Sequence, residues 1–159
     1  EPTLAWWPGK IPANSVCSEP AMTIDLLPTV AKMIGAKLPG HKIDGKNILP
    51  LMVKEGAKSP QKAYYFYYGN QLQAVRQGKW KLHFPHGYRT MAGKPGGTGG
   101  IPTNYSQAKI GLTLFDLKKD IGESIDLSTE FPEVLKRLSV MGKKFDGALK
   151  KSKRPAGKI

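Results

Sequence analysis

The chain has 159 residues, of which 40% are hydrophobic, and its formal net charge is +13. This length suffices for one buried core, and no stretch reaches the roughly 20 apolar residues that a membrane-spanning helix needs. The single cysteine, Cys17, excludes an internal disulfide framework and any metal site built on several cysteines.

The positive charge is unevenly spread along the chain. No acidic residue occurs between Glu55 and Asp116. Such a segment carries a positive field, which attracts sulfate esters, sulfated glycans, nucleic acids or acidic membranes. A lysine-rich solvated surface without a ligand is an equally good interpretation. The basic residues of the segment are Lys58, Lys62, Arg76, Lys79, Lys81, Arg89, Lys94 and Lys109.

The first predicted elements are a strand and a helix. Residues 3–7 form a short apolar run that Pro8 and Gly9 end, which is typical of a buried strand leaving a sheet. Ser18 is predicted to cap a helix that ends at Gly35. Pro28 must either kink this helix or restart it, because proline lacks the N–H group and clashes with the preceding turn.

A connection and a three-stranded meander are expected next. Proline and glycine interrupt residues 36–61 too often for a long element, so this segment is predicted to be a surface connection. Residues 63–68, 72–77 and 79–84 are short runs rich in aromatic or branched side chains, separated by tight turns. In the third run, apolar side chains alternate with basic ones, which predicts one apolar and one basic face. The apolar members are Trp80, Leu82 and Phe84, and the basic members are Lys79, Lys81 and His83.

The remaining chain is predicted to form a long loop, a fourth strand and a helix. Residues 85–111 are rich in glycine and lack periodicity, which is typical of a binding loop or a disordered segment, and the binding loop is the favoured interpretation. Residues 112–117 read as the fourth strand, and Thr129 and Pro132 open a helix whose apolar stripe would cover the sheet. Residues 151–159 form a basic tail that is expected to be disordered.

Five segments, in this order, resemble the C-terminal region of formylglycine-dependent sulfatases, which belong to the alkaline-phosphatase-like superfamily. Each match alone is a weak indication, but the five occur in the same order as in the family. Together they cover nearly the whole chain. The family usually has proline where this chain has Ile121. The segments are Trp7-Pro8-Gly9 with Ile11-Pro12, Ile24 to Thr29 with Gly35, Pro39 with Asp44-Gly45 and Ile48 to Leu51, Ala74 to Leu82, and Leu114 to Leu127.

The resemblance implies an α+β fold in this chain. Residues 1–60 would be the last strand, helix and linker of the main α/β domain. Residues 61–150 would form a four-stranded antiparallel sheet packed on a C-terminal helix.

The resemblance also implies chemistry that this chain lacks. In the family, a cysteine oxidised to formylglycine attacks the sulfate ester beside a calcium ion. Cys17 lacks the proline and arginine that the family motif places after the nucleophile. We therefore expect no catalytic residue, no metal ligand and no cofactor here, an inactive fragment, and calcium only in the full-length enzyme. Asp25 is expected to cap or orient the helix near Pro28, and Asp44 to form a turn. Asp116, Asp120 and Glu123 are expected to hold the turn after the fourth strand.

Substrate binding is the function that the resemblance leaves to this region. The expected partners are a sulfated carbohydrate or an aryl sulfate, and the missing N-terminal catalytic domain, with no nucleic acid. The alternative is a basic module that binds a polyanion, either a sulfated glycan or a nucleic acid, without catalysis. By resemblance, the enzyme would be exported, to the periplasm or outside the cell, or lysosomal. The candidate substrate-binding residues, which could equally be solvated loop residues, are His83, His86, Arg89, Lys94, Asn104 and Tyr105.

Overall fold

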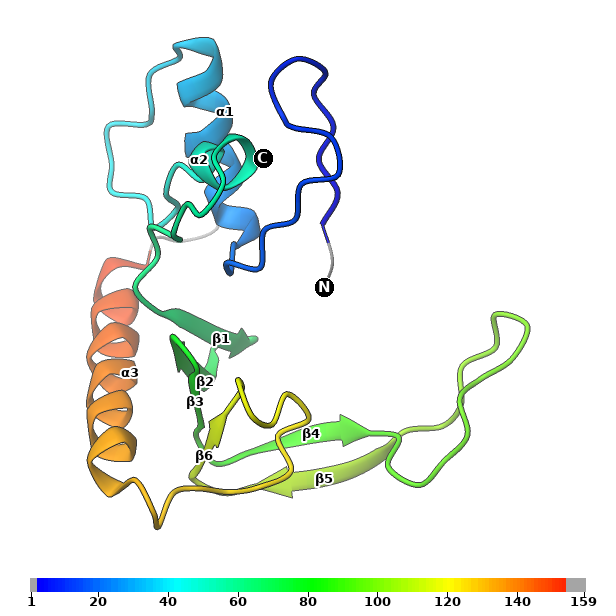
Figure 1. The fold of residues 1–159 in the computed structure, drawn as a ribbon. Coiled ribbons are helices and arrows are strands. Elements are labelled where there is room, and N and C mark those ends of the chain that lie inside the picture. Colours follow the sequence, from blue (N-terminus) through cyan, green and yellow to red (C-terminus); the bar gives the residue numbers. More distant parts are fainter. Residues whose placement is uncertain (1–2, 154–159) are drawn as a thin grey trace, which may run out of the picture. The chain divides into compact units, whose positions relative to one another are not determined.

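The computed structural model describes residues 3–153. The chain divides into two compact units, Glu1–Lys62 and Ala63–Ile159, and each is described separately. Figure 1 shows the elements of both. No helix of the described residues is long and apolar enough to cross a membrane.

The first unit is built from short helices: the 3-10 helix η1 (Thr23–Asp25), α1 (Leu26–Ile34) and α2 (Leu49–Val53). The helix predicted from Ser18 therefore begins later. Pro28 is the third residue of α1, where a proline costs no hydrogen bond because first-turn N–H groups have no partner within the helix. The chain thus restarts its helix near Pro28, one of the two expected outcomes. Gly35 ends α1 with a left-handed φ of 68°, as predicted.

The buried carboxylate of Asp25 connects the start of α1 to the following connection. It accepts hydrogen bonds from the backbone N–H of Met22 (3.0 Å) and of Lys46 (2.8 Å), and from the side-chain amide of Gln61 (2.6 Å). Thr29 extends this network, because its hydroxyl donates to the Asp25 carbonyl oxygen and accepts from the Ile48 N–H. The expected orienting role of Asp25 is confirmed, and its reach across the unit is a finding of the structure.

The strand predicted at residues 3–7 does not form. This segment has no regular structure, and Leu4 and Trp6 are 99% and 88% exposed. The prediction was wrong for the described residues because a strand needs a neighbour to pair with, and none of the described strands pairs with this segment.

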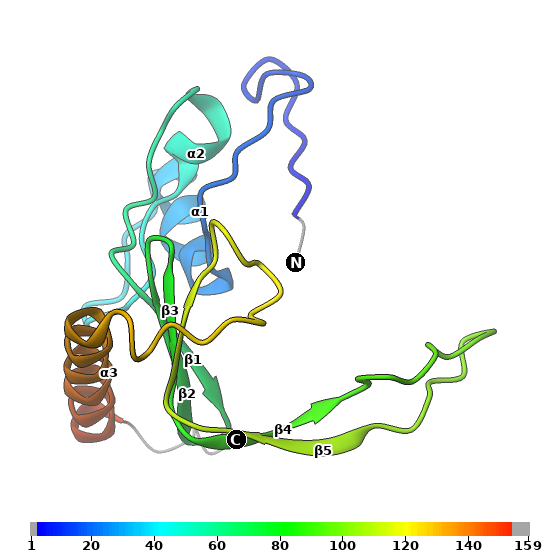
Figure 2. The same ribbon diagram turned by 60° about the horizontal axis from the view of Figure 1, so that its bottom comes forward.

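The second unit contains the predicted sheet, made of β1 (Tyr64–Tyr68), β2 (Gln71–Gln77), β3 (Trp80–His83) and β6 (Thr113–Asp116). The order is β1-β2-β3-β6, and all pairs are antiparallel. The helix α3 (Pro132–Ser152) lies against one face of the sheet, as Figure 2 shows. The predicted four-stranded antiparallel sheet packed on a C-terminal helix is confirmed.

The core lies between this sheet and α3. Val75, Leu82 and Leu114 are register partners on three adjacent strands, and together with Leu138 of α3 they are fully buried. Gly142 lets the helix approach closely, because a Cβ at this position would lie 2.7 Å from the Phe84 ring and 2.8 Å from Val75. The predicted apolar face of β3 thus faces the helix.

The prediction of a long loop at residues 85–111 was only partly right. The structure places two strands there, β4 (His86–Thr90) and β5 (Ser106–Ile110), which pair with each other and with no other described strand. We call this pair the ribbon. Figure 1 and Figure 2 both show it projecting away from the sheet. The C-terminal helix ends at Ser152, further along the chain than predicted. Residues 151 and 152 of the predicted tail are therefore helical. The part of the predicted tail at residues 154–159 lies outside the described residues.

Candidate functional site

The face of the sheet opposite α3 carries the basic side chains of β3. Because Leu82 points into the core, its neighbours Lys81 and His83 point to the other face, where His83 meets the edge of the Phe115 ring. Only 17% of the Lys81 side chain and 14% of the His83 side chain are exposed. An ammonium group that is as well covered as that of Lys81 needs compensating charge.

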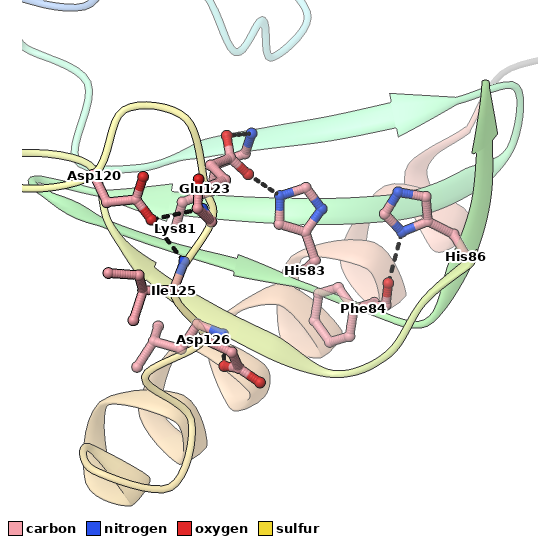
Figure 3. Close-up of polar contacts among 10 residues, drawn as sticks. Lys81, His83, Phe84, His86, Asp120, Glu123, Ile125 and Asp126 are labelled. Carbon is pink, nitrogen blue, oxygen red and sulfur yellow. Dashed lines mark hydrogen bonds and ion pairs between the residues drawn. The ribbon is translucent and has the colours of Figure 1, made fainter. Parts of the chain in front are cut away.

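Glu123 supplies that charge from the loop after β6. Its carboxylate lies 2.5 Å from Lys81 Nζ and 2.6 Å from His83 Nε2, as Figure 3 shows. Burial opposes ionisation of Glu123, but the hydrogen bonds from His83 and Lys81 outweigh it and lower its pKa to about 2. Each oxygen of the carboxylate therefore holds one base of β3 in place.

The loop that presents Glu123 is ordered by two aspartates. Asp120 accepts hydrogen bonds from the N–H groups of Ser124 (2.6 Å) and Ile125 (2.8 Å), and the N–H of Asp120 donates to the Asp116 carbonyl oxygen. Glu123 itself has a φ of 56°, a left-handed conformation that is uncommon for residues other than glycine. Asp116 and Asp120 hold the turn as predicted, whereas Glu123 reaches back to β3.

His86 adjoins this group at the start of β4. Its ring stacks near that of His83, with centroids 5.4 Å apart, and its Nδ1 lies 2.7 Å from the Phe84 carbonyl oxygen. Because a carbonyl oxygen can only accept a hydrogen bond, Nδ1 must be the donor, which fixes the ring orientation. We call Lys81, His83, His86 and Glu123 the histidine cluster. His83 uses Nε2 for Glu123, and its Nδ1 is buried. Nε2 of His86 is therefore the ring nitrogen of this cluster that can meet a ligand, and in a neutral imidazole it accepts a hydrogen bond.

The other predicted site residues lie further along the ribbon. Lys94 donates from Nζ to the Asn104 carbonyl oxygen at 3.2 Å, so these two positions meet between the ends of β4 and β5. Tyr105 is 52% exposed. Arg89 is three positions after His86 on the same strand, and its side chain therefore points to the other face of the ribbon. Two pairs among the six predicted residues are in contact: His83 with His86, and Lys94 with Asn104.

Two family profiles match this chain and together cover residues 1–158. Residues 59–158 match the C-terminal region of aryl-sulfatase, and residues 1–86 match the C-terminal part of N-sulphoglucosamine sulphohydrolase. The chain belongs to the sulfatase C-terminal family. The resemblance predicted from the five sequence segments is thereby confirmed.

Individual relatives agree with this family. Arylsulfatase A of Homo sapiens is 35% identical to this sulfatase C-terminal region, over 94% of the chain and 31% of the relative. N-acetylgalactosamine-6-sulfatase of Canis lupus familiaris is 32% identical, over 87% of the chain and 29% of the relative. The PsFucS1 sulfatase of Pseudoalteromonas has the same fold, with a TM-score of 0.72, 20% identity, and coverage of 97% and 30%. The chain spans less than a third of the relatives' length.

Sequence reasoning missed two members of the histidine cluster in this sulfatase region. Lys81 was placed on the basic face with His83 but was not among the candidate substrate-binding residues, and Glu123 was interpreted only as part of a turn. No local pattern could have placed Glu123 beside His83, because it lies 40 residues away and its contact depends on the left-handed turn.

Within residues 3–153 of this sulfatase region, no three His, Cys, Asp or Glu side chains lie close enough together to hold a metal ion. The expectation that this chain contributes no metal ligand stays a prediction, and no chemical step is assigned to a metal in this chain.

Proposed function

We propose that this chain forms the substrate-selecting side of an enzyme that hydrolyses sulfate esters of carbohydrates. The membership of the sulfatase C-terminal family supports the reaction class. The name of N-acetylgalactosamine-6-sulfatase, one of the relatives, supports a sugar as the group that carries the sulfate. The histidine cluster is the observation that carries the proposal for this chain's own role.

In this proposal, the histidine cluster binds the group that bears the sulfate. His86 accepts a hydrogen bond at Nε2 from a hydroxyl group of the sugar, because its Nδ1 carries the proton that is donated to the Phe84 carbonyl oxygen. Glu123 acts as a positioning residue that orients His83 and Lys81. Lys94, Asn104 and Tyr105, near the tip of the ribbon, contact parts of the substrate further from the reacting ester.

The nucleophile and the calcium ligands are proposed to lie outside this chain, in the part of the enzyme that it does not cover. Cys17 is exposed, and its sequence context differs from the family motif. We therefore expect the purified chain, supplied with an aryl sulfate and calcium, to show no turnover above the uncatalysed rate. Sulfate release measured by ion chromatography tests this expectation, and genuine turnover by the chain would overturn it.

His86→Phe in the full-length enzyme tests the binding role. The substitution keeps an aromatic ring beside His83 but removes the ring nitrogens. The ratio of kcat/KM for a sulfated carbohydrate to kcat/KM for an aryl sulfate is expected to fall about tenfold, the effect of losing one hydrogen bond to the sugar. His41→Phe, the same exchange in the first unit, is the control. An unchanged ratio in His86→Phe would contradict the proposed role.

The second candidate function is a polyanion-binding module without catalysis. The segment of residues 56–115, which lacks acidic residues, is the observation that favours it. Titration with heparin and with single-stranded DNA at several salt concentrations distinguishes the two functions. Steep salt dependence with no preference between the ligands would favour the module.

The place of action is part of the same proposal. Family resemblance supports an enzyme that works outside the cell, in the periplasm or in the lysosome. Fractionation of cells that produce the full-length protein tests this location.

A further inference from the structure

The two faces of the ribbon differ in chemistry because strand register sorts its side chains. Gly87 pairs with Lys109, and Arg89 pairs with Gln107. Residues at alternate positions share a face, so these four lie together. All four are exposed. We call this set the cationic strip. The other face carries His86, Tyr88, Thr90, Ser106, Ala108 and Ile110, most of which are half-buried.

The two cations of the strip lack protein partners. No salt bridge or hydrogen bond among residues 3–153 involves the side chain of Arg89 or of Lys109. Gly87 stands opposite Lys109 and has no side chain, which leaves space beside the ammonium group. Diagonal neighbours on one face of an antiparallel pair lie roughly 7–8 Å apart, so both cations can reach one extended anionic ligand.

The surrounding sequence preserves this positive charge. Acidic residues are absent from residues 56–115, so neither ribbon strand nor the loop that joins them supplies a competing carboxylate. Two cations of the sheet have carboxylate partners: Lys79 pairs with Asp116, and Lys81 pairs with Glu123. The ribbon strands and their loop carry cations without the anions that alternate with them on an ordinary solvated surface.

The chemistry of the strip favours a sulfated carbohydrate over a nucleic acid. A guanidinium group matches the oxygens of sulfate with two hydrogen bonds, and an ammonium group adds a point charge. Proteins that bind single-stranded nucleic acid also offer aromatic side chains on which bases stack. The strip contains Gly87, Arg89, Gln107 and Lys109, with no aromatic ring among them.

We propose that Arg89 and Lys109 form a second anion site, which binds a sulfate group of a carbohydrate chain that carries several sulfates. This site lies on the ribbon face opposite His86, so it holds a sulfate other than the one that is hydrolysed. The choice of carbohydrate rests on the proposed function. The preferred substrate is then a multiply sulfated oligosaccharide or polymer, and a monosulfated sugar lacks the second contact.

The test compares two double variants of the 159-residue chain that remove equal charge. Arg89→Ala/Lys109→Ala alters the strip, and Lys136→Ala/Lys144→Ala alters exposed positions of α3. The probes are a heparin hexasaccharide, glucosamine 6-sulfate and single-stranded DNA, each titrated by calorimetry at several salt concentrations. All four side chains are exposed, so both variants are expected to fold, which amide NMR spectra verify.

The strip variant is expected to bind the hexasaccharide at least about tenfold more weakly than the unaltered chain. The slope of log affinity against log salt is expected to fall by about two, because two cationic contacts are lost. The α3 variant and the binding of glucosamine 6-sulfate are expected to change less than about twofold. Equal losses in the two variants would overturn the proposal, and so would equally tight, strip-dependent binding of DNA.

Failure of this inference can be distinguished from failure of the proposed function. The binding test involves no turnover, whereas the proposed function is tested by sulfate release and by His86→Phe in the full-length enzyme. Loss of carbohydrate binding only in the strip variant supports the second site even where His86→Phe leaves the substrate preference unchanged.

Discussion

Gly45→Ala is expected to unfold the first unit, at a cost of about 4 kcal/mol or more. A Cβ at this position would lie 2.0 Å from the carbonyl oxygen of Ile24 and 2.8 Å from its carbonyl carbon. Both are backbone atoms beside Asp25, whose carboxylate binds the N–H of Lys46. The clash therefore cannot be relieved by rotating a side chain, and it separates the connection from η1.

Hydrogen exchange measures this effect at single amides. In the unaltered chain, the N–H of Lys46 donates to Asp25, and the N–H of Ile48 donates to the Thr29 hydroxyl. Both amides are expected to lose their protection in Gly45→Ala, because the unit opens. Gly40→Ala is the matched control, since a Cβ at Gly40 meets no atom within 4 Å. Protected amides in Gly45→Ala would refute the prediction.

Glu123→Gln is expected to destabilise the second unit by about 3 kcal/mol at pH 7. The pKa of Glu123 is lowered from 4.5 to about 2, and each pKa unit corresponds to about 1.4 kcal/mol. Because the folded-state pKa lies below the unfolded one, the carboxylate stabilises the fold above pH 4.5. This contribution is lost as the pH falls from 4.5 towards 2.

Urea unfolding at pH 7 and at pH 2 measures the difference between Glu123→Gln and the unaltered chain. We expect most of the difference to disappear at pH 2, because Glu123 is then protonated in the unfolded chain and about half protonated in the folded one. Glu130→Gln, an exposed carboxylate of the same segment, is the control and is expected to change stability by less than about 0.5 kcal/mol. A difference that stays the same at both pH values would show that the carboxylate acts through packing and not through its charge.

Strong local patterns made much of the second unit predictable. Alternation along β3 placed Leu82 in the core and His83 on the other face, and the apolar spacing of α3 placed Leu138 against the sheet. These assignments need only periodicity and burial. The register that aligns Val75, Leu82 and Leu114 depends on pairing between strands, which the sequence pattern alone does not specify.

The ribbon was missed because its strands have weak local signals. β4 contains Gly87, and β5 combines Ser106, Gln107 and Lys109 with only two apolar residues. Such strands form where a partner lies opposite, so their stability comes from pairing more than from β propensity. The cationic strip could not be predicted for the same reason. That Arg89 and Lys109 share a face follows from the register of the two strands, which the sequence pattern does not specify.

The candidate site was predictable only where its residues are close in the sequence. His83 and His86 lie three residues apart; His83 was selected for its place on the basic strand face, and His86 for its place in the predicted loop. Glu123 joins them through a turn held by Asp120 and by its own left-handed backbone. Contacts of this kind arise from tertiary structure, and no periodicity in the sequence predicts them.

The pairing of β3 with β6 also has an evolutionary consequence. Leu82 lies directly opposite Leu114, so all residues between these strands form one long hairpin connection. Lengthening such a connection costs little, about 0.6 kcal/mol for each doubling of its length. Insertions and deletions in the ribbon can therefore change what the protein recognises while its hydrophobic core stays the same, which makes this connection the place where related chains are free to diverge in specificity.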